Sequence, residues 1–369
     1  MNMIELHILQ SFPVTCLNRD DVGAPKSARF GGVQRARVSS QCWKRAIREL
    51  ATDYAPGQFA GQRTRYVVKA LESGFAAKGA VEAKAKTLAR ITADAIGTLD
   101  DPEKGNVKTL LFFSPQELSA VIEAVWSLGI SDDLLQHYES DDKKKAEKAK
   151  KELDALTKKA AKSLASSVKD AADIAIFGRM VADDHTLTVE GAGLFSHALS
   201  THAVSNELDF FSAVDDAKIG SDDTGAGHIG TIEFNSACYY RYVGLNLGLL
   251  ADEAHLQHFT AEERKAVLTA FIRAAVLAVP NARKNSMFGF NPPSYVLGLR
   301  RSGQPISLVN AFEQSVADGK GGYVKESEKA LKAHWSQLKG LYCLSTDTEA
   351  ELPPDNLDAF IGKLLGASV

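Results

Sequence analysis

A long helical stretch interrupts this 369-residue chain and most constrains how it can fold. Ala-rich, amphipathic segments at 76–96, 115–127 and 141–170 favour helices between about residues 56 and 175. Strand-like sequence lies on both sides, so we expect a helical insertion within an α+β fold. The last segment mixes acidic and basic side chains at helical spacing, which is more typical of a solvated helix face than of a dedicated nucleic-acid patch.

The sequence outside the insertion supplies the expected main fold. Apolar residues alternate over 3–10 and predict an opening strand. Ser39 or Ser40 then caps a helix. Further predictions are short strands at 174–181, 232–247 and 286–299, a loop at 183–232, a buried helix at 262–279 and a last helix near 355–366. Without the insertion and the loop, the order is β-α-β-β-α-β, as in ferredoxin-like and RNA-recognition-motif-like folds.

The composition excludes several classes of protein. The net charge is −3, so the chain is no uniformly basic nucleic-acid binder. Its four cysteines contain no CxxC pair, which argues against a disulfide scaffold or a cysteine zinc site. The N-terminus reads as a strand rather than as a signal peptide, and no stretch approaches the length of a membrane span. We therefore expect a soluble, cytoplasmic protein.

The strongest local charge lies near the N-terminus. Residues 19–48 hold eight basic and two acidic side chains, a net charge of +6. The basic residues are Arg19, Lys26, Arg29, Arg35, Arg37, Lys44, Arg45 and Arg48. The start of the expected helix lies among them, where free backbone N–H groups and cations can bind a phosphate. A solvated basic face that pairs with acids elsewhere explains the same pattern, and the sequence alone leaves both interpretations open.

Three other motifs point only weakly to a function. GAGHIG at 225–230 matches GxGxxG, but a strand-like segment follows it, whereas a dinucleotide site needs a helix there. Phe210 and Phe211 lie in an acidic segment, where they either anchor a loop on the core or stack on bases. His197 and His202 lack the HExxH context of a zinc protease. We find no convincing nucleophile, general base or metal site.

Several motifs in order resemble a known family. They are CLNRDD at 16–21, FGG at 30–32, RVSSQCWKRAIR at 37–48, SHALSTHAVSNELDFFSAVDD at 196–216 and GHIGTIEFNSACYYRY at 227–242. Together they closely resemble the CasC family, the backbone subunit of type I-E CRISPR Cascade complexes. The resemblance covers most of the chain and is weakest at about 56–165.

The resemblance implies a fold shaped like a hand. An RNA-recognition-motif-like palm would comprise 1–55, 174–199 and 233–369, the last with C-terminal helices. Helical fingers would occupy 56–173, and a thumb loop or hairpin would occupy 200–232. Copies would stack along the CRISPR RNA, kink it at intervals with the thumb and leave its bases to pair with target DNA.

The resemblance also implies site residues and partners. The residues that would bind RNA are Asn18, Arg19, Lys26, Ser39, Ser40, Gln41, Lys44, Arg45, Arg48, Met180, Phe210 and Phe211. The partners would be CRISPR RNA, target DNA through the guide, neighbouring copies and other Cascade subunits, in the cytoplasm of a prokaryote and away from membranes. The family implies no catalysis, metal or cofactor.

Two other functions remain as alternatives. A CRISPR RNA-processing endoribonuclease on a similar palm would need a general acid or base, for example His185 or His202. A nucleotide-binding enzyme would use the GAGHIG segment, although its flanking sequence argues against this.

Overall fold

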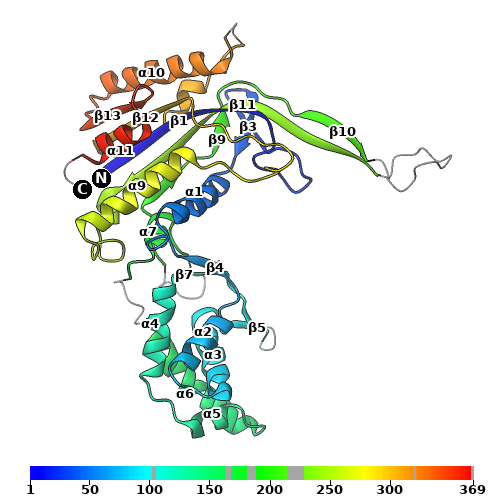
Figure 1. The fold of residues 1–369 in the computed structure, drawn as a ribbon, viewed down its shortest axis with the longest axis vertical. Helices are drawn as coiled ribbons and strands as arrows, with labels where there is room; N and C mark the ends of the chain where they lie inside the picture. Colours follow the sequence, from blue (N-terminus) through cyan, green and yellow to red (C-terminus); the bar gives the residue numbers. More distant parts are fainter. Residues whose placement is uncertain (102–104, 163–167, 181–187, 214–227, 319–320, 367–369) are drawn as a thin grey trace, which may run out of the picture. The chain divides into compact units, whose positions relative to one another are not determined.

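The computed structural model describes residues 1–101, 105–162, 168–180, 188–213, 228–318 and 321–366. The chain divides into two compact units (Figure 1). The first, here called the sheet unit, comprises Met1–Tyr54, Gly193–Gly248 and Lys265–Val369. The second, the helical unit, comprises Ala55–Ala192 and Leu249–Arg264. Each unit is described by itself.

The sheet unit combines a large antiparallel sheet with helices. Its strands are β1 (Asn2–Thr15), β2 (Ser27–Phe30), β3 (Val33–Val38), β8 (Gly193–Phe195), β9 (Ala198–Ser200), β10 (Glu207–Ala213), β11 (His228–Asn246), β12 (Tyr295–Ser302) and β13 (Thr348–Leu352). Its helices are α1 (Ser40–Tyr54), most of α9 (Ala261–Leu277), η3 (Val309–Phe312), α10 (Tyr323–Leu341) and α11 (Leu357–Leu365), and α8 (Leu247–Leu250) lies at its boundary. The expected α+β class is confirmed.

The described strands of the sheet unit form one sheet in the order β13-β12-β1-β11-β9-β3-β2, with β8 and β10 also paired to β11. At the centre, Leu6 of β1 pairs with Val243 of β11 on one side and Gly298 of β12 on the other. Both pairings are antiparallel. Beyond the centre, β11 continues with β10 as a two-stranded ribbon that extends away from the sheet (Figure 1).

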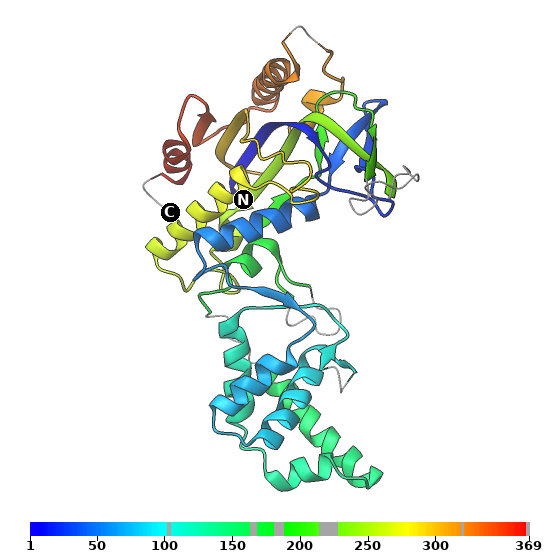
Figure 2. The same cartoon turned by 45° about the vertical axis from the view of Figure 1, so that its right-hand side comes forward.

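Helices cover both faces of this sheet, with α1 and α9 on one face and α10 on the other (Figures 1 and 2). Residues 3–10 of β1 are therefore buried without interruption. Leu9 packs in a core cluster with Leu331 and Trp335 of α10. The next residue, Gln10, points to the opposite face, because strand side chains alternate, and contacts Arg241.

A buried arginine fastens α1 and α9 to this face. The guanidinium of Arg241 donates to the carbonyl oxygens of Ala275 at 2.6 Å and Val276 at 2.8 Å, near the end of α9. It also lies 4.2 Å from the centre of the Trp43 ring on α1. Burial lowers the pKa of Arg241 to about 9, which still leaves the group charged at neutral pH. The position of α1 is thus set by a charged contact as well as by apolar packing.

The helical unit packs around its own apolar core. Its helices are α2 (Val68–Ala77), α3 (Glu82–Gly97), α4 (Pro115–Trp126), α5 (Asp132–Tyr138), α6 (Lys143–Lys162) and α7 (Ala172–Phe177). Two small two-stranded sheets pair β4 (Gln62–Thr64) with β7 (Leu111–Phe113), and β5 (Leu99–Asp101) with β6 (Asn106–Val107). Helix α6 buries the narrow stripe Ala149, Leu153 and Thr157, and exposes most of its charged side chains, as expected for a solvated face.

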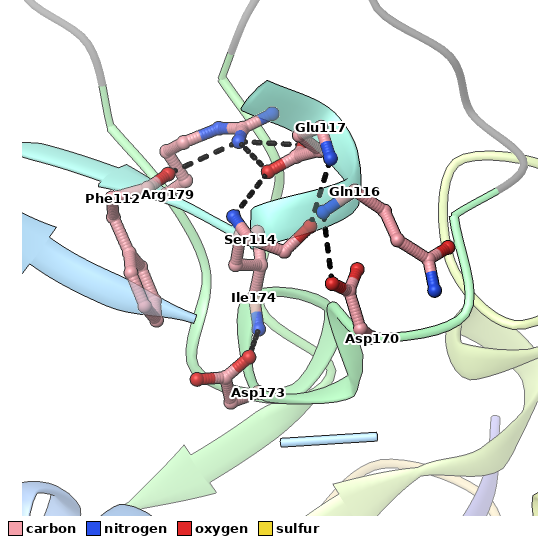
Figure 3. Close-up of polar contacts among 8 residues, drawn as sticks. All are labelled: Phe112, Ser114, Gln116, Glu117, Asp170, Asp173, Ile174 and Arg179. Carbon is pink, nitrogen blue, oxygen red and sulfur yellow. Dashed lines mark hydrogen bonds and ion pairs between the residues drawn. The ribbon is translucent and has the colours of Figure 1, made fainter. Parts of the chain in front are cut away.

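A buried ion pair joins α4 to the segment after α7 (Figure 3). One guanidinium nitrogen of Arg179 lies 2.8 and 2.9 Å from the two carboxylate oxygens of Glu117, and also donates to the carbonyl of Phe112. Glu117 accepts a hydrogen bond from the backbone N–H of Ser114, and Ser114 accepts one from Glu117, a capping box that starts α4. The ion pair of Arg179 with Glu117 thus fixes the backbone next to Met180.

Three expectations from the sequence need correction. The segment 174–181 was expected as a strand, but residues 172–177 form helix α7; a short run buried throughout has no period that separates the two. The strand expected at 286–299 begins only at Tyr295, because Pro292 and Pro293 cannot donate to a ladder. The loop expected at 183–232 contains β8, β9, β10 and the start of β11.

Candidate nucleic-acid interface

The N-terminus of α1 is held by side chains from distant segments. Ser39 caps the helix, since its hydroxyl accepts from Cys42 N–H at 3.3 Å. The backbone N–H of Ser39 donates to Asn18 Oδ1 at 2.9 Å, and that of Ser40 donates to Nδ1 of His197 at 3.3 Å. Both serines are only 9% exposed. Gln41 is exposed at the same turn. Asn18 and Ser39 therefore shape this turn.

Cations surround His197 at this turn. Arg37 Nη1 lies 3.4 Å from His197 Nδ1, and Lys26 acts on the same ring. Burial, and then these two cations, lower the pKa of His197. Because Nδ1 accepts from Ser40, the proton of the neutral ring is on Nε2. The RNA-binding residues that the resemblance implies include neither His197 nor Arg37, which the pairing of β3 with β9 brings together.

The basic side chains of α1 are held in different ways. Lys44 Nζ lies 5.9 Å from the centre of the Phe195 ring. Arg45 is largely exposed, and its Nε is 2.7 Å from Glu49 one turn later. This pair raises the pKa of Arg45 and contributes little stability, because it is exposed to solvent. Arg48 is half-buried and Arg19 is exposed. Several members of the predicted basic cluster thus lie near the start of α1, where Lys26 and Arg45 both act on the Cys42 thiol.

Arg35 does not belong to this surface. Its side chain is fully buried and donates to the carbonyl oxygens of Ser200 at 3.1 Å and Phe312 at 2.8 Å. It stabilises the contact of β3 with β9 and η3 instead. The sequence groups Arg35 with the other basic residues, because the backbone carbonyl groups that surround it belong to distant segments and cannot be recognised from the local sequence.

The ribbon of β10 and β11 separates the two adjacent phenylalanines. Phe210 pairs with Thr231, and Phe211 with Gly230. Adjacent strand residues point to opposite faces. Phe211 covers Gly230, where an added Cβ would lie 2.6 Å from its ring. Phe210 is 66% exposed, on the same face as the exposed Leu208. Only Phe210 is therefore free to contact a partner with most of its ring.

Met180 belongs to the helical unit and is 82% exposed. It follows the buried Arg179 (Figure 3). It lines a shallow opening with Arg63, Phe177 and Val189. The structure thus presents an apolar side chain on a fixed backbone, but does not place it relative to Phe210.

Two alternative sites can be compared with the structure. His202 is buried, stacks on Tyr323 at 3.5 Å, and uses both ring nitrogens: Nε2 accepts from Cys238 N–H at 3.1 Å and Nδ1 donates to the Ala203 carbonyl. Its ring has no nitrogen left for proton transfer. His185 lies outside the described residues. In the GAGHIG segment, 225–227 also lie outside them, and His228–Gly230 begin strand β11 rather than a helix.

Two features are absent from the part of the chain that the structure describes. No group of three or more His, Cys, Asp or Glu side chains there is arranged to hold a metal ion. No helix there is long and apolar enough to cross a membrane.

Two solved structures of similar architecture carry titles that name CRISPR complexes. One chain, from a structure titled "CRISPR RNA-guided surveillance complex, pre-nicking", matches with a TM-score of 0.75 and 25% identity, over 98% of this chain and 100% of that one. A chain from a structure titled "CRISPR RNA-guided surveillance complex" matches with a TM-score of 0.56 and 22% identity, over 97% and 92%, and supports the fold alone. No curated protein matches the chain. The family model described as CT1975-like protein matches residues 4–356, so the chain belongs to the CT1975-like protein family.

Proposed function

We propose that this chain is an RNA-binding backbone subunit of a CRISPR surveillance complex of the Cascade kind, and specifically a CasC-type subunit of a type I-E complex. One observation carries the proposal. The chain matches, end to end, a chain of a complex described as RNA-guided, at 25% identity and a TM-score of 0.75. CRISPR RNA and other subunits of the complex are the partners that this match supports.

The fold supports the hand-like arrangement. The central strands run β12-β1-β11-β9, with α1 and α9 on one face, in keeping with an RNA-recognition-motif-like palm. In this proposal the helical unit serves as the fingers and the β10–β11 ribbon as the thumb.

The turn at the start of α1 is suited to a phosphate chain. The backbone N–H groups of Ser39, Ser40 and Cys42 already have side-chain acceptors. The helix dipole and the cations Lys26, Lys44 and Arg45 would therefore attract the phosphates. Such contacts position a strand without reading its bases. Sequence recognition is then left to pairing between the guide and the target DNA, as in other RNA-guided systems.

The thumb and Met180 provide the proposed kink. Phe210 and Met180 are exposed apolar side chains on ordered backbone, which suits stacking on unpaired bases. Neighbouring copies would repeat the kink along the RNA, so that the bases between kinks stay free for target DNA.

We propose that the subunit does this without catalysis. The rival function, a CRISPR RNA-processing endoribonuclease, loses support because both nitrogens of the buried His202 are occupied by structural hydrogen bonds. Cleavage of a repeat RNA by the purified chain would favour the rival.

Binding of single-stranded RNA by the purified full chain tests the proposal. The variant Lys44→Ala with Arg48→Ala should weaken binding equally for unrelated sequences. The slope of log K against log salt should become shallower by about 1.4, since each lost phosphate contact to a single strand is worth about 0.7. Lys325→Ala with Lys329→Ala, two exposed lysines of α10, is the matched control. An unchanged slope in the α1 variant would count against the proposed surface.

A further inference from the structure

A hollow of about 330 Å³ lies in the sheet unit, between α1 and the segment that follows α9. Its apolar lining includes Leu17, Leu50, Met287, Phe288 and Phe290. Its volume is at the lower end of the range of about 300–1,000 Å³ for small-ligand sites. The rings of Phe288 and Phe290 are 75% and 49% exposed. Two exposed aromatic rings beside an apolar hollow form a surface on which a flat ligand can stack.

The segment 281–291 holds these rings in place. Met287 N–H donates to the Arg283 carbonyl at 2.8 Å. Asn291 Nδ2 donates to the Ser11 carbonyl at 3.2 Å. Gly289 packs against the end of β1 so closely that an added Cβ would lie 2.3 Å from Thr15 Cγ2. The segment is thus tied to β1 at Gly289 and Asn291, on both sides of Phe290, and the exposed rings have a fixed base.

The hollow is continuous with the proposed phosphate-binding surface. Glu49 lines the hollow and forms the 2.7 Å ion pair with Arg45. Next to the lining residues Leu17 and Lys284 in the sequence, Arg283 contacts the Cys16 thiol, and Arg19 acts electrostatically on the same group. Burial raises the pKa of that thiol, and these two cations oppose the shift. A strand whose phosphates contact Arg19 and Arg45 therefore passes beside the hollow.

The charges around the hollow indicate which part of the strand enters it. Glu49 and Asp53 face it from α1, and Lys284 faces it from the opposite side. A phosphate would be repelled by the two carboxylates. The amino groups of a base can instead donate to carboxylates, and its flat ring can stack on phenylalanine.

We propose that this hollow is a nucleobase site, in which Phe288 and Phe290 stack on an unpaired base of the RNA whose phosphates bind beside α1. The inference rests on the proposed function and adds a base contact to a surface that otherwise holds only the backbone. Stacking makes the contact tolerant of sequence, because every base has an aromatic face.

Binding of two fluorescent strands by the full chain tests the proposal. One is a single-stranded RNA, and the other has the same length and phosphates but abasic positions. The wild type should prefer the RNA with bases. Phe288→Ala with Phe290→Ala should lose at least about five-fold in affinity for that RNA, the effect of one lost stack. It should bind the abasic strand as the wild type does.

Two further variants sharpen the result. Phe288→Leu with Phe290→Leu keeps apolar bulk without rings and should behave like the alanine variant. Tyr342→Ala removes an equally exposed ring from the turn after α10 and should change nothing. If the alanine variant keeps the wild-type preference for bases, the nucleobase site is wrong while the proposed function stands. If the leucine variant restores binding, apolar bulk rather than ring stacking makes the contact, and the proposed stacking site is wrong. If the wild type binds neither strand, the proposed function fails as well.

Discussion

The two adjacent phenylalanines of the β10–β11 ribbon should respond in opposite ways to truncation. Phe210 is 66% exposed, so Phe210→Ala should change the free energy of unfolding by no more than about 0.5 kcal/mol. Phe211 is partly buried over Gly230. A fully buried Phe→Ala change costs about 3–5 kcal/mol, so Phe211→Ala should cost roughly 2 kcal/mol of ribbon stability.

Only the exposed Phe210 should affect the stacking of bases. In RNA-bound particles, Phe210→Ala removes the ring proposed to stack on bases, a loss of about 1–3 kcal/mol per base. In a set of RNAs with 2-aminopurine at successive positions, the wild type should give bright fluorescence at regular intervals, where the base is unstacked from its neighbouring bases. These bright positions should dim with Phe210→Ala.

Hydrogen exchange separates the two effects. Amides of 207–213 and 228–234 should exchange faster in Phe211→Ala, while Phe210→Ala leaves them protected as in the wild type. The reasoning is refuted if Phe211→Ala dims the 2-aminopurine signal without loosening the ribbon, or if Phe210→Ala loosens the ribbon.

Two predictions concern stability. Burial lowers the pKa of His7 to about 3, so only the unfolded state gains a proton as the pH falls below about 6.5. The free energy of unfolding should therefore drop by about 2 kcal/mol between pH 7 and pH 5. In denaturant titrations, His7→Gln should show a decrease in the free energy of unfolding that is smaller by about 2 kcal/mol. Arg179→Met leaves Glu117 buried without its partner and should lower the free energy of unfolding by about 3–5 kcal/mol, measured as faster hydrogen exchange in α4. The double variant with Glu117→Gln should recover much of this stability. A double variant that is as unstable as Arg179→Met would contradict the prediction.

Local patterns predicted those elements whose burial is regular along the chain. The helix expected at 262–279 is α9, Ala261–Leu277, because its apolar residues and Pro280 mark both its face and its end. The strand expected at 232–247 is most of β11. Alternation could also have separated Phe210 from Phe211, had the acidic segment around them been recognised as a strand.

Other features depend on contacts between distant segments. Arg35 leaves the basic surface because carbonyl groups from β9 and η3 surround it. His197 joins the start of α1 only because β9 pairs with β3. Residues 172–177 form helix α7 although the sequence favoured a strand nearby, because all six residues are buried and tertiary packing decides their conformation. The cap at Ser39 was predictable, since a cap needs only neighbouring residues.

The most direct test of the proposed function is the composition of the particle that the chain forms. The full chain would be expressed with its neighbouring genes and a CRISPR array, purified, weighed by native mass spectrometry and sequenced for bound RNA. We predict a large particle that holds several copies of the chain and guide-length RNA with varied spacer sequences. A monomer without RNA, or a particle that selects one RNA sequence, would contradict the proposed role as a sequence-independent backbone.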